Sequence, residues 1–306
     1  MKIVILGSGG VGGYFGGRLA AAGNAVTFVA RGSHLAALRR NGLKLISPRG
    51  NLDIPRIETA ETIGEVEAAD LVLVSVKLWD TEEIAARLGP IARRGAAIVS
   101  FQNGVQKDDL LRKYVPPDSI MGGVCYIAAA ISEPGVIRHV GTLQRLLFGE
   151  YVGRTSARSE AFLAACQKAG VDAEISDAIE KLIWEKFVFL VGLSGMTSRF
   201  RAPIGSILQD PERRAMLLQS MREVVAVGRA KGVPSRPDFA DDRLAFCDTL
   251  PATMTSSMEL DRERGRRLEL PWLSGAVVEL GAQLGVPTPV NAAIVAALTP
   301  YLRGRQ

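Results

Sequence analysis

Histidine and cysteine are scarce in this sequence, and their positions disfavour several kinds of site. There are two histidines, His34 and His139, and neither has a second histidine at metal-ligand spacing. The three cysteines, Cys125, Cys166 and Cys247, are odd in number and far apart, which predicts reduced thiols instead of a disulfide framework or a zinc cluster. Neither a zinc hydrolase nor a histidine-dependent triad is expected, so catalytic proton transfer must use other side chains.

Long hydrophobic runs and basic clusters are also missing. The apolar stretches, such as residues 187–193, end well short of the roughly 18 residues that a membrane span requires. The first apolar run is not followed by a cleavage pattern of small residues, so we expect a cytoplasmic protein with no membrane partner. The net charge of +5 is spread along the chain, which suits anionic small ligands and predicts no nucleic-acid partner.

The first half of the chain alternates short apolar runs with segments of helical periodicity. This pattern is typical of βα units around a parallel sheet. A helix at 156–169 and a strand at 172–175 are predicted to close this part of the chain. The other predicted strands are 2–6, 25–30, 71–76, 96–100 and 120–127, a hairpin within 43–57, and a pair of edge strands at 135–140 and 144–149.

Beyond residue 176 the strand pattern gives way to helical periodicity. Five helical segments are predicted, at 178–192, 211–231, 241–259, 270–284 and 291–302. We therefore expect an N-terminal α/β domain at 1–176 and an all-α C-terminal domain at 177–306.

A glycine-rich turn stands between the first predicted strand and a helix. Six residues match the pattern G-x-G-x-x-G: Gly7, Ser8, Gly9, Gly10, Val11 and Gly12. In this context the glycines permit a tight turn, a close approach of a pyrophosphate, and close packing of helix on strand. The helix N-terminus adds N–H donors. The motif predicts a Rossmann-like dinucleotide-binding domain, with a glycine-rich turn that binds no nucleotide as the alternative.

The end of the second predicted strand indicates which dinucleotide binds. Sites for NAD usually carry Asp or Glu there for the ribose 2′-hydroxyl. Here residues 26–29 run into Ala30 and Arg31, with no carboxylate nearby in the sequence. A guanidinium can bind a 2′-phosphate through two hydrogen bonds. Arg31 therefore favours NADP(H), with a solvated loop arginine as the alternative.

Six segments stand out together by their order and spacing along nearly the whole chain. They are GSGGVGGYFGGRLA, VSVK ending at Lys77, QNG around Asn103, EKLIWEK ending at Lys186, RAPIG followed by Asp210-Pro211, and SSM before Glu269. In these segments the sequence resembles the ketopantoate reductases (2-dehydropantoate 2-reductases). The resemblance implies a Rossmann domain plus a helical domain, an active site in the cleft between them, and NADPH-dependent reduction of a 2-oxo acid in pantothenate biosynthesis.

The resemblance also implies roles for single residues. Lys186 matches the general acid that protonates the carbonyl oxygen, and its apolar helix predicts a desolvated ammonium, with a snorkelling surface lysine as the alternative. Glu269 matches the catalytic carboxylate that hydrogen-bonds a substrate or product hydroxyl; a carboxylate at a helix start is its alternative. Ser257 matches a serine that holds the substrate carboxylate.

Asn103 and Lys77 both follow predicted strands at the carboxyl edge of the sheet, where ligands bind. Asn103 is expected to orient the nicotinamide or the substrate, and Lys77 to bind the same region unless it only faces water. The family pattern is broken at three positions, where Leu190, Ser194 and Met254 replace asparagines. Ser194 is still expected to contact substrate, but the loss of amides suits a 2-oxo acid more apolar than ketopantoate.

Three interpretations of function stay open at this point. The favoured one is an NADPH-dependent enzyme that reduces a small 2-oxo acid to the 2-hydroxy acid. A related NADP-dependent oxidoreductase acting on another substrate is the second, and a non-catalytic NADP-binding redox sensor is the third. A sensor needs only the cofactor turn, so the presence of Lys186 and Glu269 favours an enzyme. A homodimer is left open.

Overall fold

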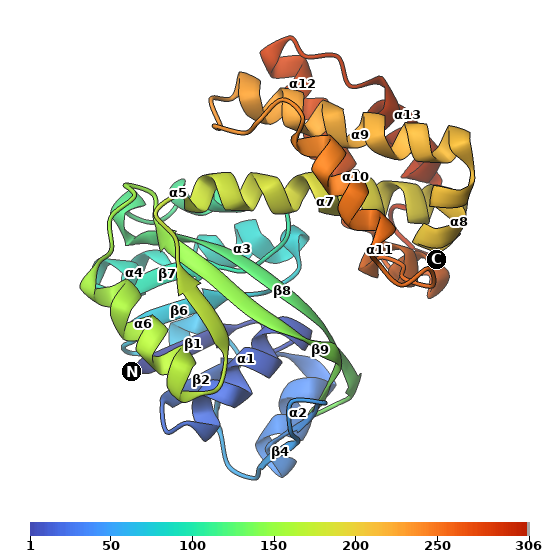
Figure 1. Cartoon of the computed structure of the whole chain (residues 1–306). Helices are drawn as coiled ribbons and strands as arrows, with labels where there is room; N and C mark the ends of the chain where they lie inside the picture. The colour runs from blue at the N-terminus through green and yellow to red at the C-terminus, as the bar shows by residue number, and fades with distance from the viewer. Residues whose placement is uncertain (305–306) are drawn as a thin grey trace. The chain divides into compact units, whose positions relative to one another are not determined.

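The structure, a computed structural model, describes residues 1–304, which form two compact units. Unit 1 contains residues 1–102 and 107–179, and unit 2 contains residues 103–106 and the chain from residue 180 onward. The α/β fold followed by an all-α fold is confirmed (Figure 1). The chain passes between the units at Ile179, close to the predicted division at 176, but nothing in the sequence pattern indicates that residues 103–106 pack with the helices.

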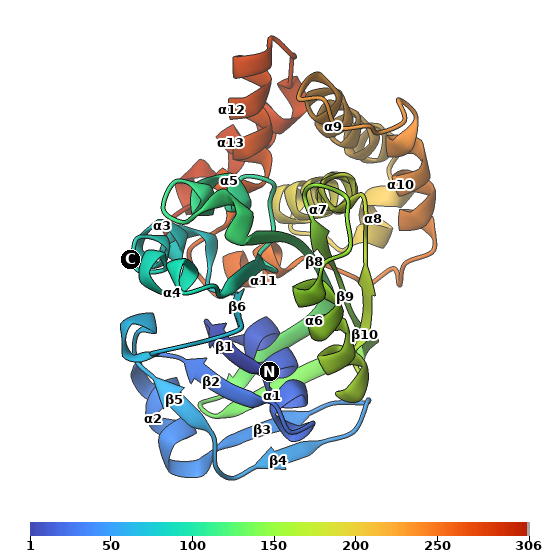
Figure 2. The ribbon, with the colours of Figure 1, turned by 90° about the vertical axis from the view of Figure 1, so that its left-hand side faces the viewer.

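Unit 1 is built on one sheet with the strand order β4-β3-β9-β8-β7-β6-β1-β2-β5, and β10 pairs with β9 (Figure 2). The strands from β5 to β8 along this order run parallel, whereas β8 and β9 are antiparallel. The strands are β1 Lys2–Leu6, β2 Ala25–Val29, β3 Leu43–Ile46, β4 Leu52–Ile54, β5 Glu58–Ala60, β6 Leu71–Val74, β7 Ala97–Ser100, β8 Ile120–Glu133, β9 Val136–Glu150 and β10 Asp172–Ile175.

Both faces of the parallel strands are buried, because successive side chains point to opposite sides. In β1, Ile3 and Ile5 pack with α1, α2 and α6, and Val4 and Leu6 pack with α3, α4 and α5. The helices of unit 1 are α1 Gly10–Ala21, α2 Gly32–Asn41, α3 Thr81–Ala85, α4 Gly89–Arg93, α5 Lys107–Arg112 and α6 Ala157–Lys168, with 3₁₀ turns η1 Ile63–Glu65, η2 Leu78–Asp80 and η3 Pro117–Ser119.

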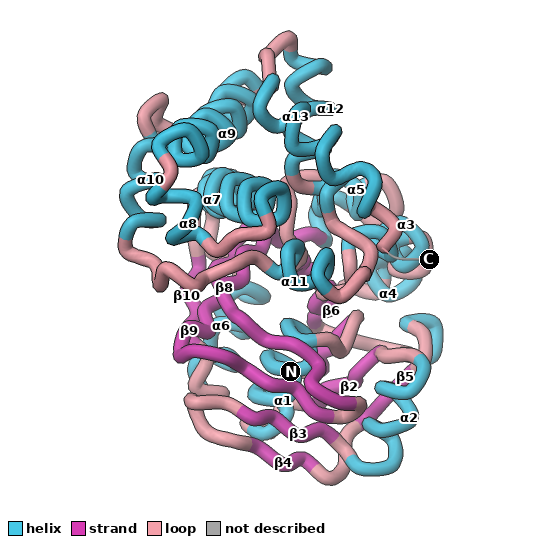
Figure 3. The backbone as a smooth tube through the Cα atoms, turned by 90° about the vertical axis from the view of Figure 1, so that its right-hand side faces the viewer, coloured by secondary structure: helices cyan, strands magenta, loops and turns pink. Residues whose placement is uncertain are grey.

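The predicted pair of edge strands at 135–140 and 144–149 is wrong. These residues form the single strand β9, which lies inside the sheet between β3 and β8 (Figure 3). Gly141 has a φ of +73°, and the pairing jumps there from Ile127–Gln144 to Ala128–Val140. Such a bulge kinks a strand without ending it. The turn signal at Gly141 therefore marks a bulge.

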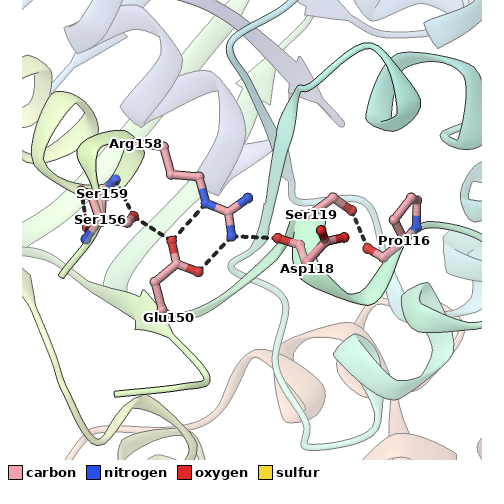
Figure 4. Close-up of polar contacts among 7 residues, drawn as sticks. All are labelled: Pro116, Asp118, Ser119, Glu150, Ser156, Arg158 and Ser159. Carbon is pink, nitrogen blue, oxygen red and sulfur yellow. Dashed lines mark hydrogen bonds and ion pairs between the residues drawn. The ribbon is translucent and has the colours of Figure 1, made fainter. Parts of the chain in front are cut away.

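A half-buried ion pair links the end of β9 to the start of α6. Glu150 accepts hydrogen bonds from Arg158 Nε at 2.7 Å, Arg158 Nη2 at 2.6 Å and Ser156 Oγ at 2.6 Å (Figure 4). Arg158 Nη2 also donates to the Asp118 carbonyl at 2.7 Å. Burial by itself would raise the pKa of Glu150, but the hydrogen bonds from Arg158 and Ser156 outweigh it and lower the pKa. The pair fixes where the last helix of unit 1 begins.

Unit 2 is built from helices around one apolar core, which includes Trp184, Phe187 and Met221. The N-terminus of α9 is capped by Asp210, whose carboxylate accepts from the Glu212 and Arg213 backbone N–H groups. The helices are α7 Ile179–Phe200, α8 Ile204–Gln209, α9 Pro211–Ala230, α10 Phe239–Asp248, α11 Ser257–Glu263, α12 Ser274–Leu284 and α13 Pro289–Leu298, with 3₁₀ turns η4 Leu270–Trp272 and η5 Thr299–Tyr301.

The single helix predicted at 241–259 is wrong. The chain forms α10 and α11 instead, with a loop that contains Pro251 between them. Proline lacks the N–H that a helix needs, so α10 ends before it. Ser256 starts the second helix, because its Oγ accepts from the Glu259 N–H at 3.1 Å. Across residues 1–304, none of the helices combines the length and the apolarity that a membrane crossing requires.

Candidate active site

The glycine-rich turn lies at the carboxyl edge of the parallel sheet. Strand β1 lies between β2 and β6, and all three run parallel, so their carboxyl ends meet at this edge. After β1 the chain forms β2 on one side of this strand, and later it forms β6 on the other side of β1. Open α/β sheets bind ligands at such a switch point.

The turn fits the approach of a dinucleotide. Gly7 has a φ of +99°, a conformation that favours glycine. A Cβ at Gly12 would lie 2.2 Å from the Gly7 carbonyl oxygen, so only glycine lets α1 pack this closely. A Cβ at Gly9 would meet no atom of the described residues within 4 Å, which leaves room for a pyrophosphate. The fully described first turn of α1 carries no acidic side chain to oppose an anion.

The other three residues of the motif support the turn. The Ser8 side chain is buried, and its Oγ donates to the Val29 carbonyl at 3.0 Å. A ligand would therefore contact the backbone of this residue. A Cβ at Gly10 would lie 2.0 Å from the Ala129 carbonyl oxygen, so α1 packs against β8 at this point. Val11 is half-buried in the first turn of α1. Their predicted contact with the cofactor stays a prediction.

His34 supports the same turn, although the sequence analysis assigned it no role. Its Nδ1 accepts from the Gly135 N–H at 3.1 Å, and its Nε2 lies 2.8 Å from the Ser8 carbonyl oxygen. Because Nδ1 accepts, the neutral ring carries its proton on Nε2 and donates it to Ser8. Burial lowers the pKa of His34, while the hydrogen bond to Ser8 opposes this shift in part. Gly135 is 101 residues away, so no local signal could have indicated this contact.

Arg31 lies just beyond the carboxyl end of β2, as predicted. It precedes α2, and its side chain is 71% exposed. Arg31 Nη2 donates to Asp80 Oδ2 at 2.7 Å. The sequence analysis found no carboxylate near Arg31, because Asp80 lies 49 residues away in the chain.

Lys77 lies beyond the carboxyl end of β6 and is exposed. Its Nζ lies 5.4 Å from the centre of the Trp79 ring, within cation–π range. Gln102 holds this loop, since its Nε2 donates to the Val76 carbonyl at 2.8 Å and to Thr81 Oγ1 at 2.7 Å. Gln102 is buried and was given no role by the sequence analysis; its place in the QNG segment, two residues beyond β7, was the sequence signal for it.

Lys186 and Asn103 come together in unit 2. Lys186 Nζ donates to Asn103 Oδ1 at 2.9 Å, across 83 residues of sequence. Lys186 is half-buried on α7, and Asn103 opens the short segment 103–106. This segment is anchored by Gln106 Nε2, which donates to Glu279 Oε2 on α12 at 3.1 Å. The sequence indicated each residue separately but not their contact.

Two of the three positions at which this chain lacks the family asparagines lie on the same face of α7 as Lys186. Leu190 and Ser194 follow Lys186 at steps of four residues, so they share its face of the helix. Leu190 is half-buried, and Ser194 is buried. Met254 packs against the core of unit 2, and its carbonyl accepts from the Ile204 N–H at 2.8 Å. This face therefore presents one apolar and one small polar side chain.

Ser257 and Glu269 each begin a helical element of unit 2. Ser257 is the exposed first residue of α11, directly after Ser256, whose Oγ lies 2.9 Å from Thr197 Oγ1. Glu269 is half-buried and precedes η4, and among the described residues its side chain makes no hydrogen bond that caps this turn. The predicted substrate contacts of both residues stay predictions.

Both halves of the chain match models of one family. Residues 3–153 match the model for ketopantoate reductase PanE/ApbA, and residues 178–301 match the model for its C-terminal domain. The chain belongs to the ketopantoate reductase family. The resemblance found in the six sequence segments is thereby confirmed, and this family member is an oxidoreductase.

Relatives and solved structures of the family cover nearly the whole chain. The uncharacterized oxidoreductase YkpB of Bacillus subtilis is 32% identical, over 98% of this chain and 99% of its own. The 2-dehydropantoate 2-reductase of Halobacterium salinarum is 33% identical, over 95% of each chain. The crystal structure of a PanE/ApbA family ketopantoate reductase from Ralstonia eutropha superposes with a TM-score of 0.89 at 31% identity, over 98% of each chain.

Proposed function

We propose that this family member reduces a small 2-oxo acid to the 2-hydroxy acid with NADPH, as a 2-dehydropantoate 2-reductase does. The hydrogen bond between Lys186 Nζ and Asn103 Oδ1 carries the proposal. It holds a proton donor beside an amide on a half-buried helix face, in a chain of an oxidoreductase family. A protein that only senses NADPH would not need Lys186.

In the proposed mechanism, bound NADPH supplies the hydride. Lys186 donates a proton from Nζ to the carbonyl oxygen of the substrate, where negative charge develops. Asn103 accepts one N–H of the ammonium, which restricts the directions of the other two. Glu269 accepts a hydrogen bond from the product hydroxyl, and Ser257 and Ser194 contact the substrate, as the family resemblance implies.

The proposed cofactor contacts lie in unit 1, apart from Asn103. The backbone of residues 7–12 takes the pyrophosphate, as the open space at Gly9 supports. Arg31 takes the 2′-phosphate of NADP(H), which its exposed guanidinium at the end of β2 favours. Lys77 and Asn103 bind the cofactor from the ends of β6 and β7.

A 2-oxo acid more apolar than ketopantoate is a second candidate substrate, and Leu190 favours it. A buried substrate hydroxyl without a partner costs about 1–3 kcal/mol. Leu190 offers no hydrogen bond on the face of Lys186, whereas the asparagine of the family would. A place in pantothenate biosynthesis depends on this choice. A cytoplasmic location and a homodimer stay predictions.

The test is NADPH oxidation by the purified protein with a panel of 2-oxo acids that includes ketopantoate, pyruvate and 2-oxoisovalerate. Turnover of at least one acid, lowered by about 10²–10⁴ in Lys186→Ala, would support the proposal. Lys181→Ala is the matched control, because Lys181 lies on the same helix and pairs with Glu185 at 3.6 Å. Tight NADPH binding without turnover of any acid would favour the redox sensor instead.

A further inference from the structure

The carboxylate of Asp80 is not used by the helix that it precedes. Asp80 holds the N-cap position of α3, where an aspartate normally accepts from backbone N–H groups of the first turn. Within residues 1–304, Asp80 makes no such capping hydrogen bond. Its Oδ2 accepts from Arg31 Nη2 instead, at 2.7 Å.

Asp80 is the more firmly held partner of this pair. Its side chain is 19% exposed, against 71% for Arg31. The loop that carries it is fixed on both sides by Gln102, which donates to the Val76 carbonyl and to Thr81 Oγ1. The ion pair therefore keeps a negative charge at the end of β2, although β2 itself ends without an acidic residue.

We propose that Asp80 is a specificity-determining residue that lowers the preference for NADPH over NADH, and this rests on the proposed role of Arg31. A 2′-phosphate that binds Arg31 comes close to the Asp80 carboxylate and is repelled by it. The 2′-hydroxyl of NADH carries no charge, and it can donate to a carboxylate as in NAD sites. Asp80 thus opposes the phosphate while leaving the hydroxyl unaffected or better bound.

The test is calorimetric binding of NADPH and NADH to Asp80→Asn, which removes the charge and keeps the size. Adenosine 2′,5′-bisphosphate and adenosine 5′-monophosphate serve as probes that isolate the 2′-phosphate. The dissociation constants of NADPH and of the bisphosphate should fall about fivefold to twentyfold, the effect of one exposed charge at close range. Those of NADH and the monophosphate should change less than about twofold, or NADH should bind more weakly.

Glu83→Gln is the matched control for the loss of one negative charge nearby. Glu83 lies on α3 and pairs at 3.2 Å with Arg87, four residues later in the turn that follows this helix. We expect its NADPH dissociation constant to stay within about twofold of the wild type, since the charge does not contact Arg31. In an Arg31→Ala background the effect of Asp80→Asn should become smaller, because Arg31 no longer holds the phosphate beside Asp80.

No change in Asp80→Asn, an equal gain for NADH, or an equal gain in Glu83→Gln would each overturn the proposal. The single variant Arg31→Ala separates this proposal from the proposed function. If Arg31→Ala weakens NADPH binding while Asp80→Asn changes nothing, Arg31 keeps its role and only the role of Asp80 fails. If Arg31→Ala leaves NADPH binding unchanged, both roles fail.

Discussion

The two units supply their functional groups in different ways. In unit 1 the groups proposed to hold the cofactor are mostly backbone groups of one continuous turn, residues 7–12, at the end of a strand. In unit 2 the polar contacts join distant segments, as Lys186 to Asn103 across 83 residues and Thr197 to Ser256 across 59. A turn depends on local sequence, whereas such contacts depend on how helices pack. Substitutions in unit 1 should therefore change cofactor binding, and those in unit 2 should change turnover.

The largest expected effect is that of Lys186→Ala on turnover. Removal of a general acid should lower kcat by about 10²–10⁴. The affinity for NADPH should stay within about twofold of the wild type, since the proposed phosphate contacts lie in unit 1. Steady-state kinetics together with fluorescence titration of NADPH measure the two quantities. A folded Lys186→Ala protein with wild-type kcat would remove Lys186 from the mechanism and make Lys77 the next candidate.

The next effect concerns unit 1. Arg31→Ala should weaken NADPH binding by about 1.5–3 kcal/mol, through lost charge-assisted hydrogen bonds, and should leave NADH nearly unchanged. Calorimetric titration of both cofactors measures this difference. Arg39→Ala is the control, because Arg39 is an exposed arginine of α2, the helix that Arg31 precedes. Equal losses for the two cofactors would contradict a role for Arg31 in binding the 2′-phosphate.

A smaller effect is expected on substrate preference. The double substitution Leu190→Asn and Ser194→Asn restores the amides on the face of α7 that carries Lys186. The double variant should raise kcat/KM for ketopantoate relative to 2-oxoisovalerate by about fivefold to a hundredfold, as one or two recovered hydrogen bonds allow. Leu284→Asn, at an exposed position of α12, is the control. If the wild type already reduces ketopantoate far better than the other acids, the interpretation of Leu190 and Ser194 is wrong.

The smallest effect is a pH dependence of stability that arises from His34. The pKa of His34 is lowered by burial, so the unfolded chain binds this proton more readily than the folded chain does. The stability that neutral His34 contributes is fully present above about pH 6.5, the ordinary pKa of histidine. It should be lost as the pH falls through the lower pKa that His34 has in the folded state. The melting temperature of His34→Gln should therefore fall less than that of the wild type between about pH 7.5 and 5.5. Parallel curves for the two proteins would contradict this.

Much of the fold could be predicted from periodicity alone. The short apolar run of β1 and the helical period of α9 are local properties of the chain, and both elements were predicted within a residue of their observed bounds. The two wrong predictions concerned a glycine and a proline, residue types that each occur in more than one kind of structure. Gly141 marks a bulge in β9 and not a turn, and Pro251 separates two helices inside a continuous helical pattern.

By itself, the sequence determined the turn at residues 7–12 and the arginine at the end of β2, because strand, turn and helix signals there lie within a few residues of one another. Only the tertiary structure decided that Arg31 pairs with Asp80, that His34 joins Ser8 to Gly135, and that Lys186 donates to Asn103. Each of these contacts joins residues far apart in the chain. Such pairs form only when the sheet and the helices pack, and no local pattern encodes them.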